Sequence, residues 1–382
     1  MTEWLSAGEA MERLGVRAQT LYAYVSRGRI EARVGAVDPR KSLYRAEDID
    51  RLRQRKARGR KAAHVAEDAI AWGEPVLASA ITTVREGQLY YRGRDATDLA
   101  RTESLESVAR LLRGGHGAAL KQRTAMAYPV EAGPRARAFL ALASRAAADA
   151  PARGRAPLAL AAEAAGLLDG FADAVAGEAH AGPIHARLAE AWSLDVAGAE
   201  LIRITLVLLA DHELNASTFA ARVTASTGAS LAASALAGLS ALSGPLHGGM
   251  APRVEAFIAE AGRVGAEAAV SARLAQGLCI PGFGHPLYPG GDPRARALIA
   301  VFAPTPTFEA VRLAGERLTG AAVNVDFALT ALVTALGLPG EAAFLLFAIG
   351  RCAGWLAHAL EQAQTGQLIR PRARYIGPDP IG

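Results

Sequence analysis

The feature that most constrains the fold is a helical spacing of apolar residues that begins near residue 76 and continues to the C-terminus. Segments rich in Ala, Leu, Glu and Arg, such as 135–148, 157–176 and 199–210, repeat apolar side chains at i, i+3 and i+4. Alternating runs typical of half-buried strands are few. Because 51% of the 382 residues are hydrophobic, the chain can bury a large core. The pattern predicts a mainly α domain over most of the chain.

The first 61 residues have a different organisation. Ser6 and Glu9 have the spacing of a capping box, with Leu5 placed to pack against the first turn. Gly15 and Val16 predict a tight turn into a second helix, which Gly28 is placed to end. The pattern then predicts helices at about 7–14 and 19–26, a hairpin over 30–34 and 42–44, and a third helix from residue 46. Two helices joined by a tight turn and followed by a hairpin predict a small winged helix-turn-helix domain.

Charge is concentrated in this front part. Residues 1–64 contain 15 Lys and Arg against 8 Asp and Glu, a net charge of +7, which leaves −2 for the other 318 residues. The domain resembles the winged helix-turn-helix of the MerR and excisionase type, which implies duplex DNA as a partner. The implied contact residues are Arg17, Gln19, Thr20, Tyr22, Tyr24, Arg27, Arg40 and Lys41. A basic linker at 51–61 would add attraction to phosphates. Docking to a protein or dimerisation is the alternative role for such a module.

Cysteine usage and hydropathy favour a cytoplasmic location without a membrane segment. Cys279 and Cys352 are the two cysteines, too few for a disulfide framework, and the opening residues lack the pattern of a secretory leader. The longest apolar run, from 327 to 350, is interrupted at Pro339 and closed by Arg351. Neither part reaches the roughly 20 residues that a membrane-spanning helix needs.

Three short stretches in the C-terminal half carry the candidate chemistry. They are Gly-Pro-Leu-His247-Gly-Gly, Pro-Gly-Phe-Gly-His285-Pro-Leu-Tyr and Asn-Val-Asp326-Phe. Glycine lets the main chain adopt positive φ and approach a ligand closely. A carboxylate with two imidazoles can act as a base beside two hydrogen-bond donors. Taken singly, each has a structural explanation, a turn histidine or a helix N-cap, so the prediction depends on their occurring together and in order.

That ordered set resembles the citrate synthase family, and further matching segments lie between about residue 76 and the C-terminus. They include Asp211-His-Glu-Leu-Asn-Ala-Ser-Thr, Asp292-Pro-Arg, Gly350-Arg and Arg370-Pro-Arg. The resemblance implies a two-subdomain all-α core over 62–382 that forms a homodimer. The large subdomain would comprise about 76–250 and 345–382, and the small one about 251–344. A small-residue segment at 221–242 suits a dimer interface, and equally an ordinary buried helix.

The resemblance also implies catalytic roles for three residues. A carboxylate at Asp326 would remove a proton from the α-carbon of an acyl-CoA. His247 would stabilise the enolate oxygen, on which charge appears as the C–H bond breaks. His285 would hydrogen-bond the ketone of a 2-oxo acid. Neither a cofactor nor a metal is needed, and Asp211 with His180, His185 and His212 lacks the compact ligand spacing of a zinc site.

A dicarboxylic 2-oxo acid requires cationic partners. The resemblance assigns this role to His212, Arg294, Arg351 and Arg370, with Asn215 and Ser217 as supporting residues and Arg370 reaching the neighbouring subunit's site. Arg294 follows an Asp-Pro helix start, where the helix dipole disfavours a cation unless an anion is near. Arg351 lies in an apolar helix, where an unpaired guanidinium is costly. A salt bridge from Arg351 to Glu341 or Glu361 is the alternative.

The coenzyme site is where the sequence departs from the family pattern. Ile280, Gly282, Phe283 and Gly284 match the turn that contacts the adenine. The loop after His285 reads Pro-Leu-Tyr-Pro-Gly-Gly, whereas the family usually places basic residues there for the coenzyme A phosphates. Arginines elsewhere, weaker binding or another thioester are the alternatives. The segment 117–175 also lacks the family's His-Pro-Met motif.

These observations favour condensation of acetyl-CoA with oxaloacetate to give citrate and CoA. Propionyl-CoA, giving 2-methylcitrate, is the closest enzymatic alternative. A third interpretation is a DNA-binding transcriptional regulator whose synthase-like domain senses acyl-CoA or oxo acid without turnover. The complete set of His247, His285 and Asp326 argues against that sensor, whereas the fused front domain and the altered coenzyme loop argue for it.

Overall fold

The computed structural model describes residues 4–16, 20–21, 24–25, 30–34, 42–50, 77–115, 128–129, 131–177, 182–373 and 375–378. The chain divides into two compact units, 1–78 and 79–382. The predicted boundary at residues 61 and 62 falls outside the described residues, so it stays a prediction.

The N-terminal unit is built on a three-stranded antiparallel sheet with strand order β1-β3-β2. Its elements are β1 (Trp4–Ser6), α1 (Ala7–Leu14), β2 (Ala32–Val34) and β3 (Ser42–Arg45). Residues 46–50 and the described parts of 20–25 are helical. A small core forms from Leu5, Ala10, Leu14, Leu21, Ile30, Tyr44, Ala46 and Ile49. Apolar residues from β1, α1, β3 and the helical segments therefore meet in one cluster, whereas Ala32 and Arg33 of β2 are exposed.

The local signals at α1 are confirmed. The Ser6 hydroxyl accepts from the Glu9 amide at 3.4 Å, and the Glu9 carboxylate accepts from the Ser6 amide at 2.8 Å, which completes the capping box. Gly15 ends the helix at φ 61°. The hairpin is present as β2 and β3, and β1 is an additional strand that the sequence pattern missed. Three residues are too few to show an alternation of side chains, so no periodicity could reveal β1.

Two of the predicted DNA-contact residues lie among the described ones. Thr20 is exposed, and Tyr24 is half-buried against the small core, so part of its ring is committed to packing. The remaining six, namely Arg17, Gln19, Tyr22, Arg27, Arg40 and Lys41, lie outside the described residues, as does the basic linker at 51–61.

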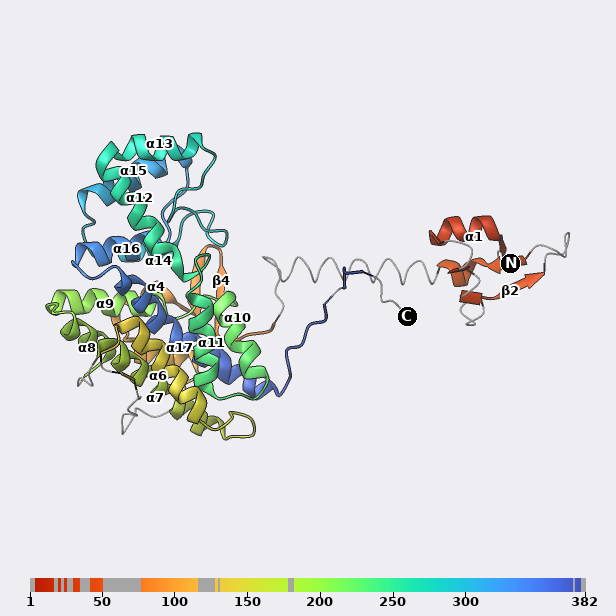
Figure 1. Ribbon diagram of the computed structural model, residues 1–382, viewed down its shortest axis with the longest axis horizontal. Coiled ribbons are helices and arrows are strands. Elements are labelled where there is room, and N and C mark those ends of the chain that lie inside the picture. The colour runs from red at the N-terminus through yellow and green to blue at the C-terminus, as the bar shows by residue number, and fades with distance from the viewer. Residues whose placement is uncertain are drawn as a thin grey trace. The chain divides into compact units, whose positions relative to one another are not determined.

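The C-terminal unit is mainly α, as predicted, and opens with a short antiparallel meander (Figure 1). The meander consists of β4 (Thr82–Arg85), β5 (Gln88–Tyr91) and β6 (Arg94–Asp95). The helices that follow are α4 (Ala96–Thr102), α5 (Leu105–Leu112), α6 (Pro134–Ala148), α7 (Pro157–Ala176), α8 (Ile184–Ala191), α9 (Val196–Leu208), α10 (Ala216–Ser226), α11 (Leu231–Leu242), the 3-10 turn η1 (Gly248–Met250), α12 (Ala251–Val264), α13 (Ala266–Ala275), α14 (Pro293–Ile299), α15 (Pro306–Thr319), α16 (Val325–Ala335) and α17 (Glu341–Thr365).

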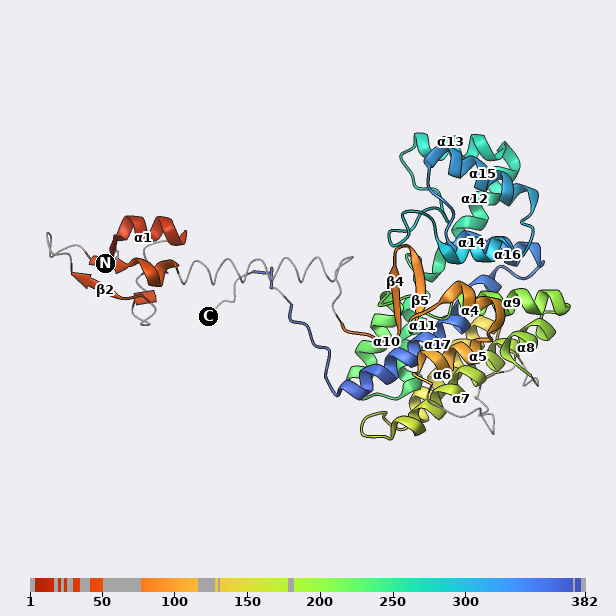
Figure 2. The same ribbon diagram turned by 180° about the vertical axis from the view of Figure 1, so that it is seen from behind.

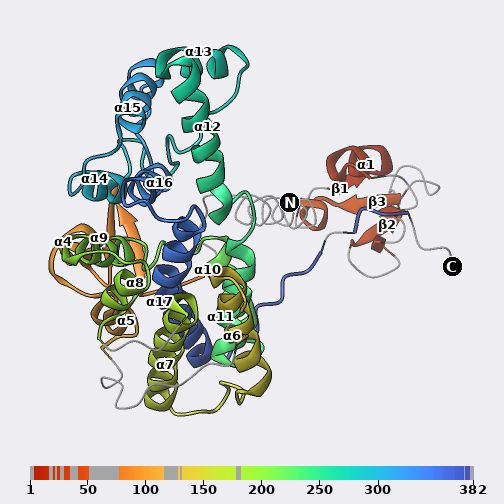
Figure 3. The same cartoon turned by 60° about the vertical axis from the view of Figure 1, so that its left-hand side comes forward.

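The helices of this unit gather into two groups. Helices α12 to α16 pack on one another at one end, and α4 to α11 form a larger group that α17 rejoins (Figures 1 and 3). The hairpin of β4 and β5 extends toward the α14 and α16 end, as Figure 2 shows from behind. The division into two subdomains with the bounds given above stays a prediction. The junction of the two helix groups lies at η1 and at the start of α17.

Helix α17 is the central element of the larger group. It packs against α7, α9, α10 and α11 and is buried along most of its length. As the sequence predicted, Arg351 lies inside an apolar helix, which continues to Thr365. By length and composition α17 could cross a membrane, and its most apolar window lies entirely inside the protein. Helix α17 is therefore a core helix of this unit.

Candidate active site

Helix α10 begins at a capped turn that organises one wall of the site. Asn215 is the N-cap, and its Oδ1 accepts from the amides of Ser217 and Thr218 at 3.1 Å each. Its Nδ2 donates to the carbonyl oxygen of His212 at 3.1 Å. The asparagine therefore ties the loop that carries His212 to the helix that carries Ser217. Asn215 and Ser217 were predicted as supporting residues of the site, and that role stays a prediction.

His247 lies between α11 and η1, and its ring reaches back to α10. Its Nε2 is 2.8 Å from the Ser217 hydroxyl oxygen. Burial, together with the nearby Arg351 charge, lowers the pKa of His247 to about 4. The next residue, Gly248, has no room for a side chain, because a Cβ there would lie 2.5 Å from the carbonyl oxygen of Leu242. The histidine is therefore neutral near pH 7, with one ring nitrogen engaged by serine.

His285 lies in the glycine-rich loop between α13 and α14. The Leu287 amide donates to Nδ1 of His285 at 3.2 Å. Since Nδ1 accepts this hydrogen bond, the proton of the neutral ring is on Nε2. Burial, with a smaller contribution from Arg294, lowers the pKa of His285 to about 4. His285 can thus act as a neutral hydrogen-bond donor through Nε2.

His212 faces His285 across the site. The two rings are 5.1 Å apart in an edge-to-face arrangement, and Nε2 of His212 is 2.8 Å from the Tyr288 hydroxyl. Burial, followed by the charges of Arg294 and Arg351, holds the pKa of His212 well below its usual range. Tyr288 lies in the loop that the sequence singled out, yet the sequence reasoning missed it. Its presence directly after the His285 motif was the available signal.

Asp326 lies in the first turn of α16, where it is not the helix cap. Asn324 is the N-cap, and its Oδ1 accepts from the Asp326 amide at 3.1 Å. Within the described part of the chain, no hydrogen bond reaches the Asp326 carboxylate. Burial raises the pKa of Asp326 to about 6, although the charges of Arg294 and Arg351 oppose this shift. A carboxylate without a structural partner and with a pKa near neutrality suits a general base.

Arg294 is buried in a fork with Asp292. Nε of Arg294 donates to Oδ1 at 3.0 Å and Nη2 donates to Oδ2 at 2.8 Å. Asp292 also accepts from the Val325 amide at 3.0 Å, in the first turn of α16. Burial alone would lower the pKa of Arg294, but Asp292 outweighs it and raises that pKa. Asp292 therefore holds the Arg294 cation close to Val325, the residue directly before Asp326.

Arg351 is 1% exposed and has little internal compensation. Its Nε donates to the Leu209 carbonyl oxygen at 3.0 Å, and its Nη2 is buried without a hydrogen-bond partner. Burial lowers the pKa of Arg351 to about 10. Glu361 is paired with Arg222 instead, and among the described residues Arg351 forms no salt bridge. The alternative pairing with Glu341 or Glu361 is therefore not seen, and the guanidinium stays open to an anion.

Arg370 is not brought to this group. It is exposed in the extended tail after α17, which leaves the helical body (Figure 1). From Arg351 to the end of α17 at Thr365, 14 residues at 1.5 Å each span roughly 21 Å. Arg370 lies five residues beyond that end. Its predicted role in a neighbouring subunit stays a prediction.

The turn predicted to contact the coenzyme is tied to the start of α16. The Asn324 amide donates to the Gly282 carbonyl oxygen, and the Gly284 amide donates to that of Ala322, both at 2.8 Å. Gly282 and Gly284 have φ of 82° and 70°, which glycine adopts without strain. The Phe283 ring packs on Phe327, 5.5 Å between centroids, and Ile280 is buried. The contacts of this turn with a coenzyme stay predictions.

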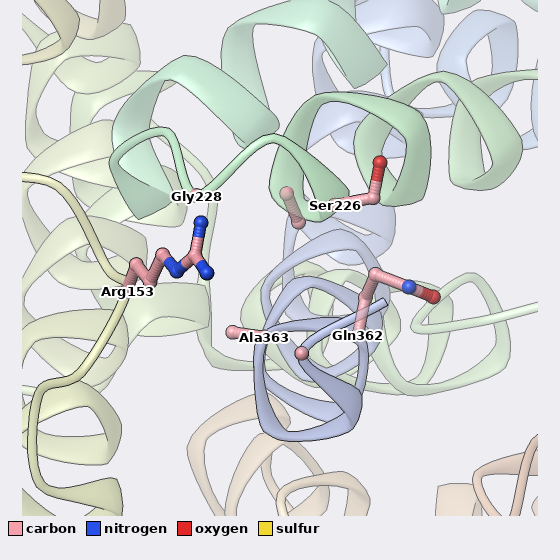
Figure 4. Close-up of a pocket in the computed structure, with 7 residues that line it drawn as sticks. Arg153, Ser226, Gly228, Gln362 and Ala363 are labelled. Atoms are coloured by element: carbon pink, nitrogen blue, oxygen red, sulfur yellow. The ribbon is translucent and has the colours of Figure 1, made fainter. Parts of the chain in front are cut away.

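Two cavities of the unit lie near opposite ends of α17. One of about 260 Å³ is lined by Arg135, Ser243, Gly248, Gly249, Glu255 and Phe344, next to the His247 loop. A smaller one of about 30 Å³ lies at the end of α17, where Arg153, Ser226, Gly228, Gln362 and Ala363 meet (Figure 4).

Among the residues that the structure describes, no cluster of His, Cys, Asp and Glu could hold a metal. His180 lies outside them.

Two buried residues of α17 that the sequence reasoning missed complete the site. Trp355 donates from Nε1 to the Ser217 hydroxyl oxygen at 3.0 Å, and His358 hydrogen-bonds Asp211 at 3.2 Å. Trp355 is four residues after Arg351, on the same helix face. This spacing of four residues could have indicated from the sequence that Trp355 lies near the site.

Comparison with known proteins places these residues in a family. The profile described as "Citrate synthase, C-terminal domain" matches residues 137–372, and that described as "Helix-turn-helix domain" matches residues 4–57. The chain is 42% identical over 194 residues to "Putative citrate synthase 2" of Mycobacterium tuberculosis, covering 47% of this chain and 52% of that protein. It is 39% identical over 194 residues to "Citrate synthase 2" of Bacillus subtilis, covering 47% and 51%. The chain thus spans about half the length of the curated relatives it matches.

Solved structures agree in fold. Citrate synthase from Pyrobaculum aerophilum aligns with a TM-score of 0.66 at 26% identity over 81% of this chain and 92% of that one. Citrate synthase from Thermoplasma acidophilum, solved with carboxymethyl coenzyme A and oxaloacetate, aligns with a TM-score of 0.64 at 22% identity over 81% and 95%. The profile match covers more than half of the chain and includes every residue of the site described above. The chain belongs to the citrate synthase family.

Proposed function

We propose that this protein condenses an acyl-CoA with oxaloacetate and hydrolyses the product thioester. The observation that carries the proposal is that the environment of Asp326 raises its pKa, whereas the environments of His247 and His285 lower theirs. Asp326 has a free carboxylate with a pKa of about 6, while His247 and His285 have pKa values of about 4. Near pH 7 the site thus presents one ionised base and two neutral imidazoles.

The proposed reaction begins with enolisation. Asp326 removes a proton from the α-carbon of the acyl-CoA, and His247 donates a hydrogen bond to the thioester oxygen as negative charge develops there. The α-carbon then attacks the ketone carbon of the oxo acid. His285 donates from Nε2 to the ketone oxygen, which becomes an alkoxide and takes up a proton from solvent, so that His285 ends the step neutral. Water then cleaves the thioester to give the free acid and CoA, and Asp326 releases its proton to solvent.

The cationic groups support an anionic second substrate. Arg351 has a buried Nη2 without a partner, and the Arg294 fork leaves Nη1 unused among the described residues. A planar guanidinium binds a carboxylate through two parallel hydrogen bonds. His212 would add a further contact, and Arg370 would come from a partner subunit in a homodimer. A dicarboxylate such as oxaloacetate fits this set of charges.

Acetyl-CoA is the proposed acyl donor, and propionyl-CoA is the alternative. A relative from Corynebacterium glutamicum, 34% identical over 186 residues that cover 46% of this chain and 49% of that protein, is named "2-methylcitrate synthase 2". A thiol-release assay with purified protein, oxaloacetate and a panel of acyl-CoAs tests the proposal. Release of thiol with acetyl-CoA and oxaloacetate together, and not with either alone, is the expected result. Absence of release with every acyl-CoA would contradict the proposal.

A second proposed function is duplex DNA binding by the N-terminal unit, and the helix-turn-helix match over residues 4–57 favours it. With a net charge of +7 in residues 1–64, affinity should fall steeply as salt rises, because each phosphate contact releases a counterion. A protein lacking residues 1–61 should keep thiol release and lose the mobility shift of genomic fragments. Absence of any shift at low salt with substrates present would favour a docking or dimerising module in a cytoplasmic enzyme.

A further inference from the structure

The Ser217 hydroxyl is a branch point with more partners than it has protons. Its oxygen is 2.7 Å from Asn215 Oδ1, 2.8 Å from His247 Nε2 and 3.0 Å from Trp355 Nε1. A hydroxyl has one proton and two acceptor lone pairs, and an indole nitrogen can only donate. Trp355 therefore always occupies one lone pair. The single Ser217 proton points either to Asn215 or to His247.

The orientation of Asn215 is not free to change. Its Nδ2 donates to the His212 carbonyl oxygen, and its Oδ1 accepts from the amides of Ser217 and Thr218. The amide oxygen therefore faces Ser217 permanently and can only accept. Only the proton positions on Ser217 and His247 can change.

Two arrangements follow, and they assign different tautomers to His247. In the first, Ser217 donates to Asn215, and His247 donates from Nε2 to Ser217, which leaves Nδ1 without a proton. In the second, Ser217 donates to His247 Nε2, so that Nδ1 carries the proton. Only the second provides a neutral imidazole with a donor on the ring nitrogen that is turned away from Ser217. That donor is what an enolate oxygen requires.

The indole N–H affects these two arrangements unequally. In the first, the Ser217 oxygen accepts from His247 and stays satisfied even without Trp355. In the second, Trp355 is the sole donor to that oxygen among the described residues. Without the indole N–H, a buried oxygen would have both lone pairs unpaired beside the Asn215 carbonyl oxygen, which is costly. The N–H therefore contributes more to the second arrangement, where it is the one hydrogen bond that the Ser217 oxygen accepts from the described residues, than to the first, where it is one of two.

We propose that Trp355 is a positioning residue that sets His247 in the tautomer with the proton on Nδ1. The inference rests on the proposed function of His247 as donor to the thioester oxygen, and it extends that function to a residue on another helix. Trp355 touches no reacting atom and acts through Ser217.

The packing around Trp355 holds the indole in this place. Trp355 is fully buried, and Gly238 of α11 lies directly against its ring. A Cβ at Gly238 would lie 2.6 Å from Cδ2 of the indole and 2.9 Å from Cε2 and Cγ. Real Cβ atoms do not approach that closely, so a larger residue at 238 must displace the indole from Ser217. The absence of a side chain at Gly238 thus gives the indole its place.

A double-mutant cycle separates this role from general packing. Trp355→Phe keeps an aromatic ring and removes the N–H, and we expect kcat to fall about tenfold, the effect of one lost buried hydrogen bond, with little change in KM for oxaloacetate. In the Ser217→Ala background the same substitution should have no further effect on kcat, because the hydroxyl that links Trp355 to His247 is already absent. Trp192→Phe, the same change in the half-buried C-cap of α8, is the control and should leave kcat unchanged. An equal loss in both backgrounds would overturn the proposal.

The tautomer itself gives a readout independent of turnover. In protein labelled with ¹⁵N-histidine, the His247 ring shifts should move toward the Nε2–H tautomer in Trp355→Phe. If that variant does not fold, 3-benzothienylalanine at position 355 keeps the indole shape without the N–H, and the same shift is expected. Unchanged ring shifts in a folded variant without the N–H would refute the role of Trp355. Failure of the wild-type protein to release thiol would instead refute the proposed function.

Discussion

The guanidinium of Arg294 forms a two-bond fork with the carboxylate of Asp292, Nε to Oδ1 at 3.0 Å and Nη2 to Oδ2 at 2.8 Å. A cation in the first turn of a helix opposes the dipole, and the sequence therefore required an anion nearby. That anion is the carboxylate of Asp292, a residue of the same chain. Because Asp292 also accepts from the Val325 amide, the fork ties α14 to the first turn of α16, where Asp326 lies.

Loss of the Asp292 charge should destabilise the fold. Asp292→Asn would leave Arg294 buried without a counter-charge, and we expect the free energy of unfolding in urea to fall by about 3 kcal/mol. Glu267→Gln is the matched control, because its pair with Arg317 is exposed, with side chains 67% and 57% accessible. That control should change stability by less than about 1 kcal/mol. Equal effects of the two variants would contradict a structural role for the fork.

Arg351 should govern affinity for the oxo acid. Arg351→Lys keeps a positive charge but loses the planar fork, so KM for oxaloacetate should rise by about tenfold or more. Steady-state thiol release at varied oxaloacetate measures this. Glu361→Gln tests the alternative partner and should leave that KM unchanged, because Glu361 pairs with Arg222. An unchanged KM in Arg351→Lys would exclude Arg351 from the carboxylate site.

Asp326 should be indispensable for enolisation. Asp326→Asn is nearly isosteric and removes the base, so kcat should fall by several orders of magnitude. Since the described residues supply no hydrogen bond to this carboxylate, the thermal unfolding midpoint should not fall. Deuterium exchange of the acyl-CoA methyl group, followed by NMR, measures the proton-transfer step directly. Substantial exchange in the variant would assign the base to another residue.

The pH dependence of turnover should follow Asp326. Its pKa is raised to about 6, so the ionised base accumulates as pH rises through 6, and kcat/KM should increase over pH 5–7 and then level off. His247 and His285 have pKa values of about 4 and stay neutral over this range, so they should add no limb above pH 5. A profile that is flat between pH 5 and 7 would contradict the assignment.

A shared active site should allow complementation between subunits. If Arg370 reaches the partner's site in a homodimer, mixing Arg370→Ala with Asp326→Asn should restore activity, because one hybrid site keeps both residues. The two proteins are mixed under conditions that exchange differently tagged subunits, as checked by co-purification. Exchange without recovery of thiol release would show that Arg370 does not act across the dimer.

Much of the local structure was determined by the sequence itself. The Ser6–Glu9 capping box, the turn at Gly15 and the helical period over the C-terminal unit depend on contacts within a few residues. The motifs around His247, His285 and Asp326 likewise indicated the family, because their types and order can be read directly. Such features need no knowledge of which elements meet.

Tertiary structure alone decided how these residues are supported. Trp355 meets Ser217 across 138 positions of sequence, and His358 meets Asp211 across 147. No local period encodes such pairs, since they depend on how α17 packs against α10 and the preceding loop. The same packing left Arg351 buried without a salt bridge among the described residues. Protonation states follow from this burial, and burial is a property of the assembled fold.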